Sequence, residues 1–197
     1  MFRMSYIFQD WAANKGNLKG RLVMVLFRLA RPASINKFFR ILWLPYLAFY
    51  KVFVEWFLCI ELPHWTKVGK NFYLGHGHAL VVNGCTVIGE NCFFRHSTTL
   101  GNIRREDGSY SGSPIIGNNV ELGSNVCIIG EVRVGNNVRI GAGSVVVKDI
   151  PDNSIAVGNP ARVIKTVAPF NETPTVEENR KKEGSRTEAE KVAIPFA

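Results

Sequence analysis

The amino-acid sequence predicts a mainly β fold, a parallel β-helix preceded by an α-helical N-terminal region. The first observation is a period of six, because one residue in six is aliphatic from residue 116 to residue 146. A strand alternates with period two and a helix with a period of about 3.6, so six fits neither. The second observation is a small residue or turn former after most of these aliphatics, which are Ile116, Leu122, Ile128, Val134, Ile140 and Val146.

Sustained hexads are typical of a solenoid in which three units make one triangular coil. Successive coils then stack about 4.8 Å apart through backbone hydrogen bonds. Aliphatic side chains of adjacent coils are expected to stack inside the prism, Ile116 on Val134 and Leu122 on Ile140. A β-sandwich with evenly spaced turns is the alternative, but it needs register slips that this stretch does not show.

A weaker hexad register runs from residue 60 to residue 100 and slips by two residues at positions 83–86. The slip makes one coil twenty residues long. We therefore expect His76 and His96 to occupy the same phase on adjacent coils. After Gly101 the register breaks over a polar excursion, residues 102–114. Excursions from a regular solenoid are usually where function was added.

The N-terminal region, residues 1–58, is predicted to be helical. Candidate helices cover residues 5–13, residues 18–31 before Pro32, and residues 38–59 with an interruption at Pro45. The last segment has no uncharged run of about 18 residues, which argues against a transmembrane span. Burial of an apolar stripe against sister subunits is the preferred interpretation. Contact with an anionic membrane surface stays open, and so does a true span.

Charge and cysteine content bound the class of protein. Residues 1–58 carry nine Lys and Arg against two Asp and Glu, so most of the net charge of +8 is N-terminal. These cations interleave with large apolar residues instead of forming an exposed stripe, which argues against nucleic-acid binding. The four cysteines show no CxxC spacing, which indicates a reducing compartment without disulfides. No signal-peptide pattern is present, so we expect a cytoplasmic protein, with the inner face of the membrane as the variant.

The β-helix is predicted to span residues 59–165. The charged, Pro-containing segment 166–197 shows no apolar period and is predicted to be largely disordered.

With its hexads, interrupting loop and ending Asn159-Pro160-Ala161-Arg162, the sequence resembles the left-handed β-helix acyltransferases, and serine O-acetyltransferase most of all. That family has a carboxylate fifteen residues before its catalytic histidine, the spacing of Glu61 and His76 here. The resemblance implies a left-handed coil, a helical region that builds subunit contacts, and transfer of an acetyl group from acetyl-CoA.

The chemistry requires a base for the acceptor hydroxyl. A neutral imidazole is suited to this near pH 7, and His76 is the candidate. Glu61 would hold the other ring nitrogen and stabilise the imidazolium, as the third member of a triad does. By resemblance, the backbone N–H of Asn102 would donate to the oxyanion of the tetrahedral intermediate.

The resemblance also implies a groove between neighbouring prisms for acetyl-CoA. Pantetheine amides would pair with backbone near Ser124 and Ala142, and Lys148, Arg162 and Lys165 would meet the nucleotide phosphates. Sites between subunits imply a homotrimer, with a dimer of trimers through the N-terminal helices as an extension.

The acceptor is harder to predict. In the serine enzymes an aspartate precedes the histidine, and an Arg-His pair precedes the proline that re-enters the β-helix. Here Gly75 and Gly112-Ser113 occupy those places. Burying the ammonium or carboxylate of serine without partners is costly, so a neutral sugar hydroxyl of a polysaccharide or its precursor is preferred over serine. Candidate acceptor-binding residues are His96, Arg104, Arg105 and Asp10.

Alternative interpretations remain for these residues. His76 and Glu61 are also compatible with a packed turn histidine and a solvated acid. Two histidines one coil apart raise the possibility of zinc, but no convincing third ligand exists, so no metal is expected. A β-helix that only binds or scaffolds is the second class of function.

Overall fold

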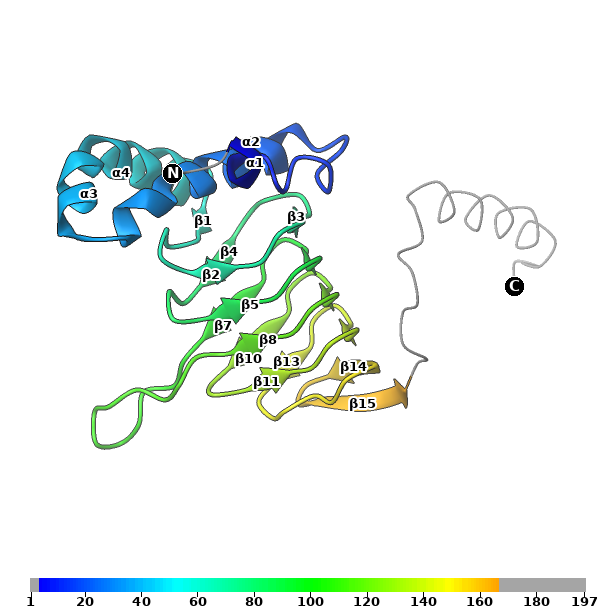
Figure 1. Ribbon diagram of the computed structural model, residues 1–197. Helices are drawn as coiled ribbons and strands as arrows, with labels where there is room; N and C mark the ends of the chain where they lie inside the picture. The colour runs from blue at the N-terminus through cyan, green and yellow to red at the C-terminus, as the bar shows by residue number, and fades with distance from the viewer. Residues whose placement is uncertain (1–3, 167–197) are drawn as a thin grey trace. The chain divides into compact units, whose positions relative to one another are not determined.

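Three sheets, parallel except for the pairing of the last two strands, form the faces of a triangular prism in the computed structural model, which describes residues 4–166 (Figure 1). Face A contains β1 (Ile60–Glu61), β4 (Leu80–Val82), β7 (Thr99–Gly101), β10 (Cys127–Ile129) and β13 (Val145–Val146). Face B contains β2 (Lys67–Val68), β5 (Val87–Ile88), β8 (Ile115–Ile116) and β11 (Arg133–Val134). Face C contains β3 (Tyr73–Leu74), β6 (Phe93–Phe94), β9 (Glu121–Leu122), β12 (Arg139–Ile140), β14 (Ser154–Gly158) and β15 (Ala161–Thr166).

The strands pair in the register that the hexads predict. Ile116 pairs with Val134, and Leu122 pairs with Ile140. The twenty-residue coil is also confirmed, because Leu74 pairs with Phe94. The left-handed β-helix and the helical region before it are therefore as expected.

The predicted position of the slip, residues 83–86, is wrong. Leu80 pairs with Ile60 twenty residues earlier, whereas Val82 pairs with Leu100 eighteen residues later. The two extra residues therefore lie in the His76 turn between β3 and β4.

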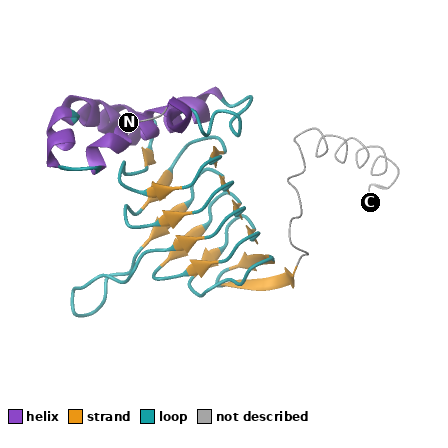
Figure 2. Ribbon diagram, viewed as in Figure 1, coloured by secondary structure: helices purple, strands orange, loops and turns teal. Residues whose placement is uncertain are grey.

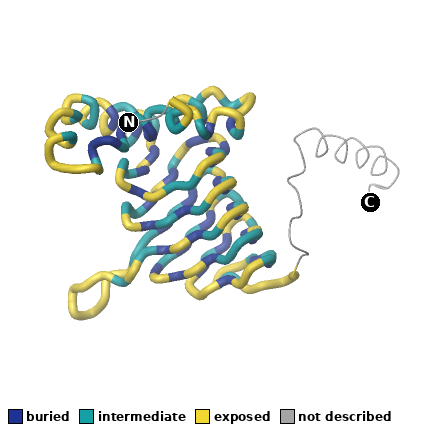
Figure 3. The backbone as a smooth tube through the Cα atoms, viewed as in Figure 1, coloured by how far each residue is buried: buried dark blue, intermediate teal, exposed yellow. Residues whose placement is uncertain are grey.

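Inward side chains of the strands fill the prism, two each from β4 and β14 and none from β15. These positions, such as Leu74, Phe94 and Leu122, are fully buried and form one continuous core (Figure 3). Outward neighbours in the same short strands are more exposed, as the alternation of a strand requires. Burial of a large aliphatic side chain contributes about 1.5–3 kcal/mol, so the stacked hexads dominate the stability of the prism.

Asparagines turn the chain at the edge between faces B and C. Each has a positive φ between 55° and 58°, a conformation that asparagine tolerates better than most residues. Their side-chain amides form a ladder from coil to coil, with N···O distances of 2.9–3.0 Å. The ladder satisfies polar groups along the whole edge, and its members are Asn71, Asn91, Asn119, Asn137 and Asn153.

The helical region lies across the first coil (Figure 2). It consists of α1 (Met4–Ile7), α2 (Leu18–Ala30), the 3₁₀ helix η1 (Arg31–Ser34), α3 (Lys37–Leu42), α4 (Leu44–Tyr50) and the π-helix η2 (Lys51–Phe57).

Three helix boundaries differ from the prediction. The first helix ends at Ile7 instead of residue 13, because the following residues form turns that bring Asp10 and Asn14 onto the β-helix. Pro32 does not end the helical path, since a proline is accepted in the first turn of η1. The break in the last segment falls at Trp43, and Pro45 lies in the first turn of α4.

Buried polar side chains fasten the helical region to the open edge of the first coil. The Arg28 guanidinium donates to Asp10 at 2.8 and 3.2 Å and to the carbonyl oxygens of Val68 and Gly69. Asp10 also accepts the Phe72 N–H. Asp10 is 1% exposed, so its carboxylate is committed to this contact. The expectation that Asp10 binds the acceptor is not supported by this position.

No helix within residues 4–166 is both long and apolar enough to cross a membrane. The predicted disordered tail lies outside the described residues except for Thr166, which ends β15.

Removing one partner of the Asp10–Arg28 pair should strongly destabilise the protein. Asp10→Ala leaves a guanidinium buried without its carboxylate, which costs about 3–5 kcal/mol in the free energy of unfolding. Lys51→Ala is the control, because the Lys51–Glu55 pair is exposed on the lysine side and contributes about 0.5 kcal/mol or less. Urea titration measures both, and equal effects would contradict the assignment of Asp10 as a structural clamp.

Candidate active site

Two edges of face A carry most of the predicted site residues. We call the edge between faces C and A the histidine edge, and its turns contain His76, His96, Ser124 and Ala142. We call the edge between faces A and B the loop edge, and it contains the excursion 102–114 and Lys148. The predicted residues therefore divide between opposite edges of one face.

Backbone hydrogen bonds connect the histidine edge from coil to coil. The Ser97 N–H donates to the His78 carbonyl at 2.9 Å, and the Asn125 N–H donates to the His96 carbonyl at 3.1 Å. The Gly143 N–H continues the series to the Ser124 carbonyl at 2.9 Å. The turns that hold His76 and His96 are thus aligned with the turns that hold Ser124 and Ala142.

His76 and His96 lie side by side, as the twenty-residue coil predicts. Their ring centroids are 5.5 Å apart and the rings meet edge to face. His76 has a φ of 63°, in the left-handed region, so the turn presents it in a conformation that is uncommon outside glycine. The Nδ1 atom of His96 is buried and has no hydrogen-bond partner among the described residues. A buried nitrogen without a partner is costly.

Glu61 lies on β1, paired with Val81 on β4, the strand that follows the His76 turn. Its side chain is exposed, and no hydrogen bond joins it to His76 in this structure. Catalytic hydrogen bonds are often long before substrate binds. The pairing of Glu61 with His76 therefore stays a prediction.

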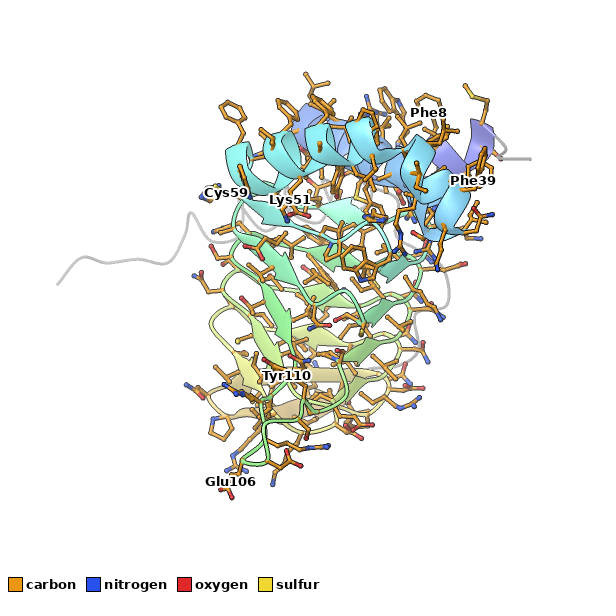
Figure 4. All side chains as sticks on the ribbon, turned by 90° about the vertical axis from the view of Figure 1, so that its left-hand side faces the viewer. Phe8, Phe39, Lys51, Cys59, Glu106 and Tyr110 are labelled. Atoms are coloured by element: carbon orange, nitrogen blue, oxygen red, sulfur yellow. The ribbon has the colours of Figure 1, made fainter. Side chains whose placement is uncertain are left out.

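Asn102 begins the excursion on the loop edge. Its backbone N–H makes no hydrogen bond within residues 4–166 and is free to donate. Arg104 and Arg105 follow in a hairpin that is closed by the Arg104–Tyr110 bridge. Hydrogen bonds from Ser109 lower the pKa of Asp107, so its carboxylate stays ionised at the tip. The hairpin projects away from the prism (Figures 1 and 4), and Arg104 and Arg105 are both exposed.

The three cations predicted for nucleotide phosphates are also divided. Lys148 follows β13 on the loop edge, while Arg162 and Lys165 lie on β15, which covers the last coil antiparallel to β14. A single chain does not bring Lys148 together with Ser124 and Ala142.

An aromatic cluster beside His76 was missed by the sequence reasoning. A Cβ atom at Gly75 would lie 2.7 Å from the Phe93 ring, so Phe93 occupies the space beside this turn. Tyr73 packs edge to face on Phe93 at 4.6 Å, and the Arg95 guanidinium lies 5.2 Å from the Phe93 centroid. The available signal was the pair of aromatics at the outward positions of two consecutive face C hexads.

The described chain offers no metal cluster. Within residues 4–166, no three His, Cys, Asp or Glu side chains come together as ligands. Two surface hollows lie beside the helical region. One is lined by Arg28, Arg31 and Lys67 among others. The second is lined by Leu29, Leu42, Trp43, Pro45 and Tyr46. Neither hollow contains a predicted catalytic residue.

Known proteins resemble the chain in sequence and fold. The family "Bacterial transferase hexapeptide (six repeats)" matches residues 113–148. The putative colanic acid biosynthesis acetyltransferase WcaB of Escherichia coli is 38% identical over 161 residues, which are 80% of this chain and 98% of that protein. Serine acetyltransferase 3 of Arabidopsis thaliana is 43% identical over 98 residues, which are 50% of this chain and 25% of that protein.

Solved structures give the same relationship. Soybean serine acetyltransferase has a TM-score of 0.68 at 30% identity and covers 81% of this chain, which in turn covers 68% of it. Brucella abortus serine acetyltransferase in complex with coenzyme A has a TM-score of 0.69 at 28% identity, with 83% and 68% of the two chains covered. The expected acetyltransferase activity is confirmed, and the chain belongs to the hexapeptide-repeat acetyltransferases of the left-handed β-helix fold.

Proposed function

We propose that this enzyme transfers the acetyl group of acetyl-CoA to a hydroxyl of a saccharide, with His76 as the general base. The observation that carries the proposal is the alignment of His76 and His96 with the turns of Ser124 and Ala142 along one edge. A donor that extends along this edge brings its thioester to the histidines.

The steps follow from the side chains. One ring nitrogen of His76 takes the proton of the acceptor hydroxyl while the hydroxyl oxygen attacks the thioester carbonyl. Negative charge forms on the carbonyl oxygen, and the free N–H of Asn102 donates to it. The C–S bond then breaks, and the His76 imidazolium returns its proton to the leaving sulfur. Glu61 stabilises that imidazolium while it exists.

This mechanism requires residues from two protomers, since His76 and Asn102 lie on opposite edges of face A. From β4 to β13 the outward positions of face A are uncharged, which suits burial at an interface; they are Val81, Thr99, Cys127 and Val145, and the charged Glu61 lies outward only on β1. A heterologous interface that closes as a ring places one edge of a face against the opposite edge of its neighbour. We therefore propose a homotrimer in which the histidine edge of one protomer meets the loop edge of the next.

The donor groove fits the backbone of the histidine edge. Within residues 4–166 the N–H and C=O groups of Ala142 make no hydrogen bond, and neither does the Ser124 N–H. These groups are available to the amides of a pantetheine arm. Lys148 of the adjacent protomer, with Arg162 and Lys165 at the end of the prism, would meet the nucleotide phosphates.

The space around His76 favours a sugar as acceptor. Phe93 fills the place that an acidic side chain at position 75 would need, so no carboxylate next to His76 holds an ammonium group. The exposed parts of the Tyr73–Phe93 pair offer apolar faces on which a sugar ring can pack. The His96 side chain and the arginines Arg104 and Arg105 of the neighbouring loop supply polar contacts. The extensive similarity to a protein named for colanic acid, a polysaccharide, supports the same choice.

Serine remains the second acceptor, because most of the similar solved structures are serine acetyltransferases and because Arg104 or Arg105 can pair with its carboxylate. Acetyl-CoA as donor and four free cysteines are consistent with a reducing, cytoplasmic setting.

Replacement of His76 should abolish most turnover and leave the donor bound. His76→Ala and His76→Asn should each lower kcat by about 10²–10⁴-fold, the usual contribution of a general base. His76→Asn is the matched variant, because asparagine tolerates the positive φ and keeps the turn. Release of CoA, followed with a thiol reagent, gives kcat, and calorimetry gives CoA affinity. Full turnover in either variant would remove His76 from the mechanism. If the wild-type protein did not bind CoA, the result would favour a non-catalytic scaffold function.

The acceptor is tested by comparing L-serine with sugars and nucleotide sugars in the same assay. We expect turnover with a sugar and none with serine. Gly75→Asp alone should not create serine activity, because the new Cβ meets Phe93, and it should lower stability. Gly75→Asp with Phe93→Ala relieves that clash and serves as the comparison. If the wild-type enzyme acetylated serine and none of the sugars, the result would contradict the saccharide assignment.

A further inference from the structure

The outer surface of the helical region exposes apolar side chains in helical stripes. On α3, Phe38, Ile41 and Leu42 are 70%, 68% and 57% exposed. Their i, i+3, i+4 spacing places them on one face, which an ordinary surface helix turns toward its core. Here that stripe faces away from the protein.

The segment from α4 through η2 repeats the arrangement. Phe49, Phe53 and Phe57 stack ring on ring at 5.4 and 5.7 Å, and Phe57 is 75% exposed. Trp56 beside them is 67% exposed. Side chains of the helical region, Phe8 among them, point away from the prism (Figure 4). The exposed residues together make an apolar surface that we call the outer face: Phe8, Trp11, Leu18, Leu22, Phe38, Ile41, Leu42, Leu44, Phe49, Val52, Trp56 and Phe57.

The charges of this region have one sign. Its two carboxylates are engaged, since Asp10 is buried against Arg28 and Glu55 pairs with Lys51 at 3.1 Å. The accessible cations include Lys15, Lys19, Arg21, Lys37 and Arg40. Arg21 lies over the Trp11 ring, 4.5 Å from its centroid. The outer face therefore combines aromatic rings with cations and has no free carboxylate within residues 4–58.

This composition distinguishes between two partners that could cover the outer face, a second copy of the chain and a membrane surface. A second copy docked face to face would bring cations against cations without an acid to pair them, which costs energy on both sides. An anionic bilayer surface supplies the missing negative charge, and its interfacial zone accepts Trp and Phe. We propose that the outer face binds the surface of an anionic lipid membrane, with the helices lying in the interface and the β-helix standing away from it.

The proposal is independent of the acetyl acceptor and is tested without measuring catalysis. Sedimentation with vesicles of phosphatidylcholine alone, or with about 30% phosphatidylglycerol, separates apolar from charge-dependent binding. We expect binding to the anionic vesicles only, weakened by high salt. Trp56→Ser with Phe57→Ser should weaken binding at fixed salt, because it removes two exposed rings and changes no charge.

Matched charge reversals locate the surface. Lys37→Glu with Arg40→Glu should weaken binding at least about tenfold, because each cation near an anionic surface contributes about fivefold. Arg104→Glu with Arg105→Glu changes the net charge equally on the excursion loop and should bind nearly as wild type. Equal loss in both pairs would overturn the assignment to the outer face.

Absence of binding at low salt would also overturn the proposal. Light scattering, which gives the mass of the oligomer, then tests whether a second copy of the chain covers the outer face. A hexamer that Trp56→Ser with Phe57→Ser splits into trimers would mean that a second copy covers the outer face.

Discussion

The open edge of the first coil is the constraint on which the structure depends. Each inner coil makes backbone hydrogen bonds with the coils above and below it, but the first has no coil above it. An uncovered edge is a site for aggregation, and solenoids require a cap. Here the cap is made of side chains, because Asp10, Asn14, Asn17 and Arg28 satisfy the backbone groups of residues 68–74. The helical region is thereby fixed to the β-helix by contacts within one chain.

At the opposite end the chain uses backbone instead. The β15 strand turns back antiparallel on β14 and covers the last coil. With both ends covered, the regular coils between them supply a rigid frame. Two departures from that regularity concern the proposed site, and they lie on the two edges of face A. The twenty-residue coil brings His76 beside His96, and the excursion leaves at Asn102 on the other edge.

Periodicity made the prism predictable. Stacking of Ile116 on Val134 and the shared phase of His76 and His96 follow from counting hexads, because each coil must return to the same register. Contacts between distant segments could not be counted in this way. From the sequence, Asp10 is a plausible acceptor ligand. Only the fold shows that its carboxylate already accepts hydrogen bonds from the Arg28 side chain and the Phe72 N–H. Phe93 reaches Gly75 for the same reason, since their contact spans adjacent coils. The first helix ends early, at Ile7, because the turns that contain Asp10 and Asn14 serve the cap.

The residues of the proposed site are divided between two edges of face A. The proposed base lies on one edge of face A and the proposed oxyanion donor on the other, so the proposed mechanism needs both edges. Under the proposed mechanism, this division makes the arrangement of protomers part of catalysis.

Mixed trimers test this claim most directly. Subunits with His76→Asn and subunits with Asn102→Pro, which lacks the oxyanion N–H, should each form inactive trimers. When the two are coexpressed in equal amounts and assembled together, about one quarter of the sites combine an intact histidine edge with an intact loop edge. The account predicts recovery of about that fraction of wild-type CoA release. No recovery in properly assembled mixed trimers would show that each site belongs to a single chain, and would contradict the account.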